Sequence, residues 1–323
     1  MKIVLISFDY FDFDVHIINE LKKRNIEAHH IDISKYYYEY KSFGEKIKNV
    51  ASKLFLGKNI KKVKTEEFII SELQKLGKQD KILTIRPDRI SKKTHLIIKN
   101  FCTEYITYFY DSSNRFSIDY LLKGIFDTIY TFDLDDSKKY NLKHITNYIY
   151  LDKKELDSTK KYTTDLFNIA SVDERLTLLN KIANQCEQLK INFKFIIVGK
   201  KKPQNIHPHI VFSKKNKFID EVITELDEAK VFLDLIRKNQ NGLSFRIFEA
   251  LAYQKKIITS NTSIQEYDFY NPNNILVIDE KEPEIPIAFF ESPYQPLPEE
   301  LYHKYTIENW VSTVFELNSA SNS

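Results

Sequence analysis

The stretch that decides the fold is NGLSFRIFEALA, residues 241–252. It lies between two apolar runs, residues 229–236 (AKVFLDLI) and residues 256–260 (KIITS). Runs of this length, separated by a polar loop and an amphipathic segment, predict a strand, a short loop, a helix and a second strand. We therefore start from a strand–loop–helix–strand unit and work outward along the chain.

Four residues of this unit indicate a nucleotide or phosphate site. Gly242 permits a tight turn after the first strand, and Ser244 is suited to cap the helix. Arg246 and Glu249 are three residues apart and share one helix face. The carboxyl end of a parallel strand, next to a helix N-terminus, is where open α/β sheets bind nucleotides and phosphates.

The same alternation runs through the whole chain. Predicted strands cover residues 2–7, 26–33, 80–86, 105–110, 127–132 and 147–151, and then 166–170, 193–198, 210–212, 229–236, 256–260 and 275–278. Predicted helices cover residues 15–23, 65–77, 91–101, 117–123, 172–189, 218–226 and 301–317. This order predicts the α/β fold class, with largely parallel sheets covered by helices on both faces.

A charged, apolar-poor segment, residues 152–164, interrupts the alternation and is predicted to be a linker. We therefore expect two tandem Rossmann-like domains, residues 1–155 and 156–300. Residues 301–323 are expected to form a closing helix that packs back on the protein, followed by a disordered tail. In such an arrangement, the cleft between the domains is the default binding site.

Composition excludes several classes of protein. The chain has 323 residues, 42% of them hydrophobic and 29% charged, which fits a folded soluble protein of two domains. No apolar run approaches the ~20 residues of a membrane span, and the N-terminus has no signal-peptide pattern. The net charge of +3 does not indicate nucleic-acid binding, and two distant cysteines predict a reducing cytoplasm.

Residues 41–64 form a strongly basic segment in which apolar residues recur at helical spacing. A basic amphipathic helix can lie on an anionic membrane surface. The alternative, which we prefer, is a solvated helix whose apolar stripe packs on its own domain.

Ionisable residues gather where the first predicted strand ends: Asp9, Asp12, Asp14 and His16. Asp111 follows the predicted strand 105–110 in the same way. Asp9, Asp14 and Asp111 are therefore candidate general bases at a cleft. Aspartate is also common at helix N-termini, and for Asp14 we expect the cap of helix 15–23.

The 239–260 segment resembles a known family. The string GLSFRIFEALAYQKKIITS is similar to the donor-binding segment of bacterial GT-B glycosyltransferases of the spore-maturation-protein-like group and of lipopolysaccharide or capsule biosynthesis. Shorter strings resemble the same group: residues 108–112 (YFYDS), 126–127 (FD), 132–136 (FDLDD) and 167–171 (FNIAS), with Glu174 and Arg175 opening the next helix.

The resemblance implies that a nucleotide sugar binds mainly the second domain and the acceptor mainly the first. Glu249 would accept hydrogen bonds from the ribose hydroxyls. Arg246 would either stabilise the leaving phosphate or orient Glu249, and further cations would be Lys200 and Arg175. Backbone N–H groups would hold the diphosphate at Asn241, Gly242, Leu243 and Ser244.

Asn241 marks a departure from the family. Retaining GT-B enzymes often carry a second glutamate eight residues before the ribose glutamate, and here that position is Asn241. The resemblance therefore leaves retention or inversion open. It implies no obligatory metal or other cofactor and a UDP- or GDP-linked sugar as co-substrate, with UDP favoured.

Two motifs bear on metal binding. Asp133 and Asp135 have the DxD spacing that holds Mn²⁺ or Mg²⁺ in GT-A glycosyltransferases, but we expect them to cap the helix-like segment that follows. His207-Pro208-His209 has no acidic partner nearby in the sequence, so we expect a surface loop there. No metal ligands are predicted.

We therefore expect a cytoplasmic glycosyltransferase, most simply a hexosyltransferase. Peripheral contact with the inner face of the cell membrane through residues 41–64 is one of the two alternatives for that segment. Its acceptor would be a glycan or a lipid-linked glycan in surface polysaccharide or lipopolysaccharide biosynthesis. Two alternatives stay open. One is a metal-dependent GT-A enzyme that uses Asp133 and Asp135, and the other is a non-catalytic nucleotide-binding or structural protein of the same fold.

Overall fold

The computed structural model describes residues 1–40, 42, 43, 47, 49, 59–157, 159–215 and 219–317. Most of the basic segment 41–64 and the predicted disordered tail, residues 318–323, lie outside this part of the chain. The chain divides into two compact units: unit 1 is residues 1–145 with 311–323, and unit 2 is residues 146–310. This division differs from the expected one, because residues 146–155 belong to unit 2.

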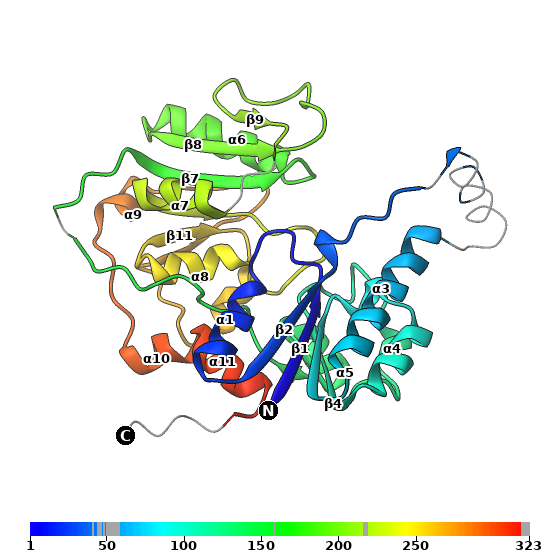
Figure 1. Ribbon diagram of the computed structural model, residues 1–323. Coiled ribbons are helices and arrows are strands. Elements are labelled where there is room, and N and C mark those ends of the chain that lie inside the picture. The colour runs from blue at the N-terminus through cyan, green and yellow to red at the C-terminus, as the bar shows by residue number, and fades with distance from the viewer. Residues whose placement is uncertain are drawn as a thin grey trace. The chain divides into compact units, whose positions relative to one another are not determined.

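Unit 1 is built on a six-stranded parallel sheet with the order β2-β1-β3-β4-β5-β6 (Figure 1). Its strands are β1 (Lys2–Ser7), β2 (Glu27–Asp32), β3 (Gln79–Ile85), β4 (Cys102–Phe109), β5 (Thr128–Thr131) and β6 (Lys143–His144). Its helices include α1 (Val15–Lys23), α3 (Ile60–Leu76), α4 (Lys92–Lys99) and α5 (Leu134–Tyr140). The strand order reverses between β1 and β3, which makes this pair the topological switch point.

Unit 2 contains a second six-stranded parallel sheet, with the order β12-β11-β10-β7-β8-β9. Its strands are β7 (Thr164–Ser171), β8 (Phe193–Val198), β9 (Val211–Ser213), β10 (Ala229–Asp234), β11 (Lys256–Thr259) and β12 (Ile275–Val277). Counted within the unit, this is the 3-2-1-4-5-6 order of dinucleotide-binding folds, with the switch point between β7 and β10.

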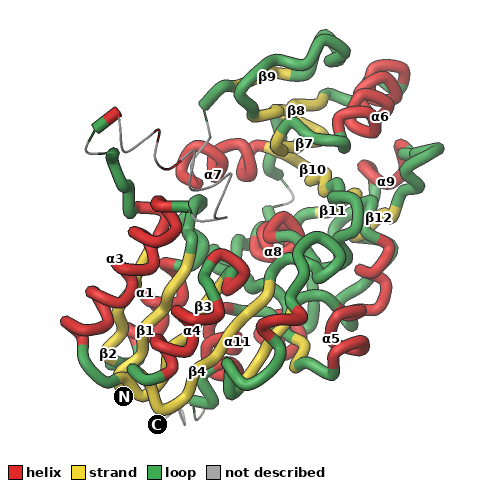
Figure 2. The backbone as a smooth tube through the Cα atoms, turned by 90° about the vertical axis from the view of Figure 1, so that its right-hand side faces the viewer, coloured by secondary structure: helices red, strands yellow, loops and turns green. Residues whose placement is uncertain are grey.

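Helices alternate with the strands of unit 2 (Figure 2). They are α6 (Leu176–Gln188), α7 (Ile219–Glu228), α8 (Phe245–Ala252), α9 (Ile287–Glu291), α10 (Glu299–Lys304) and the beginning of α11 (Ile307–Val314). The strands are apolar along their length, as in Phe232 and Leu233, because the central strands of a parallel sheet are buried on both faces.

Residues 147–151 were predicted to form a strand, and that prediction is wrong. The segment makes a single bridge, between Ile149 and Thr306, and otherwise runs along α8. Asn147 Nδ2 donates to the carbonyl of Leu243 (2.9 Å), and the N–H of Lys154 donates to the carbonyl of Ala252 (2.8 Å). The apolar pattern of this segment therefore reflects burial against other elements of unit 2 rather than pairing in a sheet.

The predicted helix 301–317 is two helices, α10 and α11. The backbone between them bonds to Ile149 instead of continuing the helix: Ile149 N–H donates to Tyr305 O (2.8 Å), and Ile307 N–H donates to Ile149 O (3.0 Å). The predicted helix 117–123 is also reduced, to a 3-10 turn over Asp119–Leu121.

Candidate functional site

Asp9 and Asp14 follow β1 at the switch point of unit 1, and both are buried. The prediction that Asp14 caps α1 is wrong. Asp14 stands at the N-cap position, but its side chain makes no capping hydrogen bond. Asp9 does this instead, because its Oδ2 accepts from the N–H of Val15 (3.0 Å). The loop folds back far enough for this contact, and Asp12 adopts a left-handed conformation within it (φ 58°).

The Asp14 carboxyl has an unusual charge environment. Burial, and then the nearby charges of Asp9 and Asp32, raise the pKa of Asp14 to about 8, although a hydrogen bond with Ser7 opposes the shift. Burial is also the largest cause of the raised pKa of Asp9. Closely spaced buried carboxyls cannot all ionise, so the cluster retains a proton near neutral pH. A carboxyl with a pKa in this range is suited to general acid–base chemistry.

Three residues that sequence reasoning missed complete this acid cluster: Ser7, His30 and Asp32. Ser7 Oγ lies 2.8 Å from His30 Nε2, and burial lowers the pKa of His30 to about 4, so the imidazole is neutral. Asp32 differs, because hydrogen bonds from Ser34 and Lys35 lower its pKa despite burial. Ser7 and Asp32 are register partners at the ends of β1 and β2. The parallel pairing of β1 and β2 is the signal that could have identified Ser7 and Asp32.

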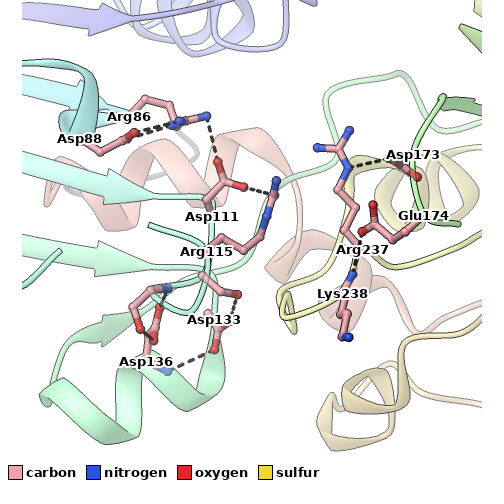
Figure 3. Close-up of polar contacts among 12 residues, drawn as sticks. Arg86, Asp88, Asp111, Arg115, Asp133, Asp136, Asp173, Glu174, Arg237 and Lys238 are labelled. Carbon is pink, nitrogen blue, oxygen red and sulfur yellow. Dashed lines mark hydrogen bonds and ion pairs between the residues drawn. The ribbon is translucent and has the colours of Figure 1, made fainter. Parts of the chain in front are cut away.

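Asp111, the other candidate base, is held by two guanidinium groups (Figure 3). Its Oδ2 lies 2.9 Å from Arg86 Nη1, and its Oδ1 lies 2.8 Å from Arg115 Nη1. Arg86 also donates two hydrogen bonds to Asp88, each of 2.9 Å, from a left-handed backbone conformation (φ 61°). Since both oxygens of Asp111 are engaged with cations, this geometry favours Asp14 as the base.

The DxD pair is engaged at a helix terminus. Asp133 Oδ1 accepts from the N–H groups of Asp135 (2.9 Å) and Asp136 (3.1 Å), and so caps α5 as predicted. The other oxygen of Asp133 accepts from the hydroxyl of Ser112. A metal bound by Asp133 would have to displace these bonds.

Ser244 caps α8 in unit 2 and confirms the prediction for this residue. Its Oγ accepts from the N–H of Arg246 (3.2 Å) and donates to Asp234 Oδ1 (2.7 Å). Thr259 Oγ1 donates to the other oxygen of Asp234 (3.0 Å). Asp234 ends β10 and ties the cap to the sheet. Sequence reasoning assigned no role to Asp234, which is the one acidic residue in the run 229–236.

The loop before α8 is held by its carbonyl groups. Asn241 O accepts from Ser263 Oγ (2.6 Å) and Asn261 Nδ2 (3.1 Å). In contrast, the N–H groups of Gly242, Leu243 and Ser244 donate to no group in the described part of the chain. Of these three residues, Gly242 and Leu243 are buried and Ser244 is partly exposed, at the start of a helix whose N-terminus favours anions.

Gly242 was expected to permit a tight turn before the helix, and it lies in the short loop between β10 and α8. Gly242 is not among the residues with positive φ, and the left-handed residue of this loop is Asn239 (φ 61°). Asparagine adopts this left-handed conformation more readily than most residues with a side chain, which explains why it occupies this position of the loop.

Arg246, Glu249 and Tyr150 form a buried polar trio. Arg246 Nη1 lies 2.5 Å from Glu249 Oε2, and the Tyr150 hydroxyl donates to Glu249 Oε1 (2.6 Å). Burial and the charge of Glu249 raise the pKa of Tyr150, so its hydroxyl stays a donor. The guanidinium also lies over the rings of Phe167 and Phe232, with its carbon 5.7 and 5.8 Å from their centroids.

This trio has a consequence for ligand binding. Glu249 is only 4% exposed, and both its oxygens face protein groups. Of the two roles expected for Arg246, the structure contains the one that orients Glu249. A ribose hydroxyl could reach Glu249 only by replacing one of these contacts, the Tyr150 hydrogen bond or the Arg246 ion pair. Sequence reasoning missed Tyr150, which lies 99 residues away along the chain.

Arg175 connects the ends of the two strands at the switch point of unit 2. It donates two hydrogen bonds to Asp173 (2.8 and 2.6 Å) and one to the carbonyl of Leu235 (2.9 Å). Arg237 also donates to Asp173 (3.1 Å), a contact drawn in Figure 3. Two guanidiniums, those of Arg175 and Arg237, therefore share one carboxylate. Cationic groups from the ends of β7 and β10 therefore meet at this edge of the sheet.

Lys200 is exposed just after β8, where Gly199 permits close packing. A Cβ added at Gly199 would lie 2.8 Å from Val172 Cγ2. Lys200 is thus presented at the same, carboxyl edge of the sheet as Arg175, and its ammonium is open to solvent.

Comparison with known proteins supports the fold. No family model and no curated protein matches the chain. A UDP-forming α,α-trehalose-phosphate synthase from Burkholderia xenovorans, in complex with glucose-6-phosphate, is 9% identical over 99% of this chain and 100% of its own, with a TM-score of 0.58. The lipopolysaccharide outer core galactosyltransferase WaaB is 11% identical over 98% of this chain and 99% of its own (TM-score 0.52).

The N-terminal domain of trehalose-6-phosphate phosphatase from Candida albicans is similar too, with 11% identity over 98% of this chain and 97% of its own (TM-score 0.54). At such low identity the similarity shows the fold alone. It confirms the predicted α/β class: two Rossmann-like units with the fold of GT-B glycosyltransferases. Among the described residues, no helix is long and apolar enough to cross a membrane.

Proposed function

We propose that the protein is a glycosyltransferase that moves a sugar, most simply a hexose, from a nucleotide-sugar donor to a glycan or lipid-linked acceptor. The observation that carries this proposal is the anion-binding edge of unit 2. There, the N–H groups of Gly242, Leu243 and Ser244, just before α8, donate to no group among the described residues, and Arg175 and Arg237 share a single carboxylate. A departing nucleoside diphosphate needs this kind of stabilisation.

In this proposal, unit 2 binds the donor. The backbone at 242–244 holds the diphosphate together with Arg175 and Lys200, and UDP is the favoured carrier. Glu249 binds the ribose diol after exchanging its hydrogen bond with Tyr150. Arg246 stays beside Glu249 and keeps its carboxylate oriented. Asn241 stands where retaining enzymes often carry a second carboxylate. The base-assisted displacement described next applies to an inverting reaction, and the anomeric configuration of the product, read by NMR, decides between inversion and retention.

Unit 1 supplies the base. The ionised form of Asp14 takes the proton of the acceptor hydroxyl while that oxygen attacks the anomeric carbon. The bond between the anomeric carbon and the diphosphate breaks, and its electron pair leaves with the diphosphate. Since the pKa of Asp14 is raised to about 8, we expect the rate of transfer to rise with pH up to about that value. Asp9 caps α1 and, by its charge, helps to keep the pKa of Asp14 high.

The cellular setting is part of the same proposal. We place the reaction in surface polysaccharide or lipopolysaccharide biosynthesis, in the cytoplasm at the inner face of the membrane. The basic segment 41–64 would make the peripheral contact. The resemblance of the 239–260 segment to lipopolysaccharide and capsule enzymes supports this assignment.

The direct test is thermal unfolding of the full chain against a panel of UDP- and GDP-linked sugars, because a ligand that binds the folded state raises Tm. We expect one UDP-sugar to raise Tm and to be consumed when an acceptor is added. If no nucleotide sugar changes Tm, the proposal fails. Loss of transfer with EDTA and rescue by Mn²⁺ would favour the metal-dependent alternative instead.

A matched pair of variants tests the ribose contact. If Glu249 binds the ribose, Glu249→Gln weakens binding of the UDP-sugar about tenfold or more but has little effect on its 2′-deoxy analogue. Tyr150→Phe, which removes only the competing hydroxyl, keeps the preference for ribose. If Glu249→Gln weakens both ligands equally, Glu249 is an internal structural carboxylate and the ribose assignment is wrong.

A further inference from the structure

A cluster of potential metal ligands lies in unit 2, at the C-terminal end of α6. Glu187 belongs to the last turn of α6, and His207 and His209 come from the loop before β9. Their ligand atoms lie within 4.8 Å of one another. The prediction that the two histidines lack an acidic partner was therefore wrong. The acid comes from a helix that ends 19 residues before His207.

The carboxylate bridges the two rings. Glu187 Oε2 lies 3.3 Å from His207 Nε2, and Oε1 lies 2.5 Å from His209 Nδ1. The ring centroids are 5.7 Å apart. His207 is buried, but the side chains of Glu187 and His209 are 42% and 69% exposed. An ion can thus reach the cluster from solvent.

The backbone that carries these ligands is held by other contacts. Asn180 of α6 ties down the loop at two points: its Nδ2 donates to Asn205 O (2.8 Å), and its Oδ1 accepts from the N–H of His207 (3.0 Å). Cys186, next to Glu187, is fully buried in the core of the unit. Pro208 stiffens the turn between the histidines. The three ligands are therefore positioned before any ion binds.

We propose that Glu187, His207 and His209 bind one divalent transition-metal ion, for which Zn²⁺ is the natural candidate. Two imidazole nitrogens and one carboxylate oxygen suit zinc, whereas Mg²⁺ and Ca²⁺ prefer oxygen ligands alone. Water fills the remaining position. The ion replaces the internal contacts between the rings and the carboxylate.

Binding has an identifiable cost. His207 Nδ1 accepts from the N–H of His209 at 3.3 Å, so the neutral ring carries its proton on Nε2, the atom that faces Glu187. For Nε2 to bind the metal, the proton moves to Nδ1 and this long hydrogen bond is lost. The affinity is therefore lower than that of a site built entirely for zinc.

The position of the cluster indicates a structural role. The loop 205–210 leads into β9, so the cluster lies at the amino ends of the parallel strands of unit 2. The loop 241–244 follows β10 and lies at the opposite, carboxyl edge. The ion would join the end of α6 to the loop before β9 without entering the reaction. This inference does not depend on the proposed function.

The test uses the full chain, freed of metal with EDTA and titrated with Zn²⁺ by calorimetry. We expect one Zn²⁺ per chain, and binding weakened about tenfold or more in His209→Ala and in Glu187→Gln. Both residues are exposed enough for the variants to fold. His303→Ala, which removes an exposed histidine elsewhere in unit 2, is the matched control and should bind Zn²⁺ as the wild type does.

A second readout is thermal unfolding with and without Zn²⁺. Zinc should raise Tm of the wild type and of His303→Ala, and raise it much less in the other two variants. Equal affinities in all four proteins would mean that Zn²⁺ binds elsewhere, and absence of binding would mean that the cluster is only a hydrogen-bonded His–Glu–His contact. Either result overturns the inference. Nucleotide-sugar binding should be the same with or without EDTA, which keeps this test separate from that of the proposed function.

Discussion

The N-termini of α1 and α8 are built from the same parts but have opposite electrostatics. Each helix follows a parallel strand at the switch point of its sheet, and each is capped by a side chain. The cap of α1 is the carboxylate of Asp9, with Asp14 buried beside it. The cap of α8 is the neutral hydroxyl of Ser244. Burial and the neighbouring carboxylates make the α1 site hold a proton, whereas the neutral hydroxyl cap adds no negative charge at the start of α8.

Replacing the proton-holding group should have the largest effect. We expect Asp14→Asn to lower the rate of transfer about 100- to 10,000-fold, because the acceptor loses its general base, while donor affinity stays unchanged. Steady-state kinetics with a donor-binding assay would measure both. Asp135→Asn is the matched control and should retain the wild-type rate. A collapse with Asp135→Asn and not with Asp14→Asn would contradict our assignment of the base.

The same substitution should change how stability depends on pH. Burial raises the pKa of Asp14 from 3.8 to about 8, so between these values the unfolded chain loses a proton that the folded protein keeps. The free energy of unfolding of the wild type therefore falls as pH rises through this window, by up to about 1.4 kcal/mol per pH unit from this group.

Asp14→Asn removes this dependence, so its stability relative to the wild type should increase between about pH 5 and about pH 8. Urea unfolding of both proteins at the two pH values measures the difference. A difference that does not change with pH would show that Asp14 ionises normally in the folded protein.

Replacing the cap of α8 should have a smaller effect, seen in the free energy of unfolding. Ser244→Ala removes the cap of α8 and the hydrogen bond to Asp234, and we expect it to lower the free energy of unfolding by about 1 kcal/mol. Ser244→Thr keeps the hydroxyl and should cost less. Denaturant unfolding would rank the stabilities of the three proteins. Equal stability of Ser244→Ala and the wild type would show that the Ser244 hydroxyl does not stabilise α8.

Sequence reasoning succeeded where the signal was local. Ser244 and Asp133 were identified as helix caps, and both strand series were placed, because a cap acts over two or three residues and a strand needs only a run of apolar residues. It failed at residues 147–151, because an extended segment buried against a helix has the same apolar pattern as a strand.

Residues that act through distant partners could not be found in this way. Tyr150 reaches Glu249, Ser7 pairs with Asp32, and Glu187 faces two histidines only after the sheets have set their register. Asp14 was a candidate base from the start, but its raised pKa follows from burial beside two other acids. No single stretch of sequence encodes that environment.

Residues 147–154, which run along α8, determine where a fragment containing unit 2 can begin. Asn147, Tyr150 and Lys154 bond to Leu243, Glu249 and Ala252, and so brace the helix from its start to its end. A fragment that began at the charged linker, after residue 155, would lack this brace and leave the buried Glu249 short of a donor. A fragment of residues 146–310 retains it. The residues that look like the end of the first domain are thus the first indispensable part of the second.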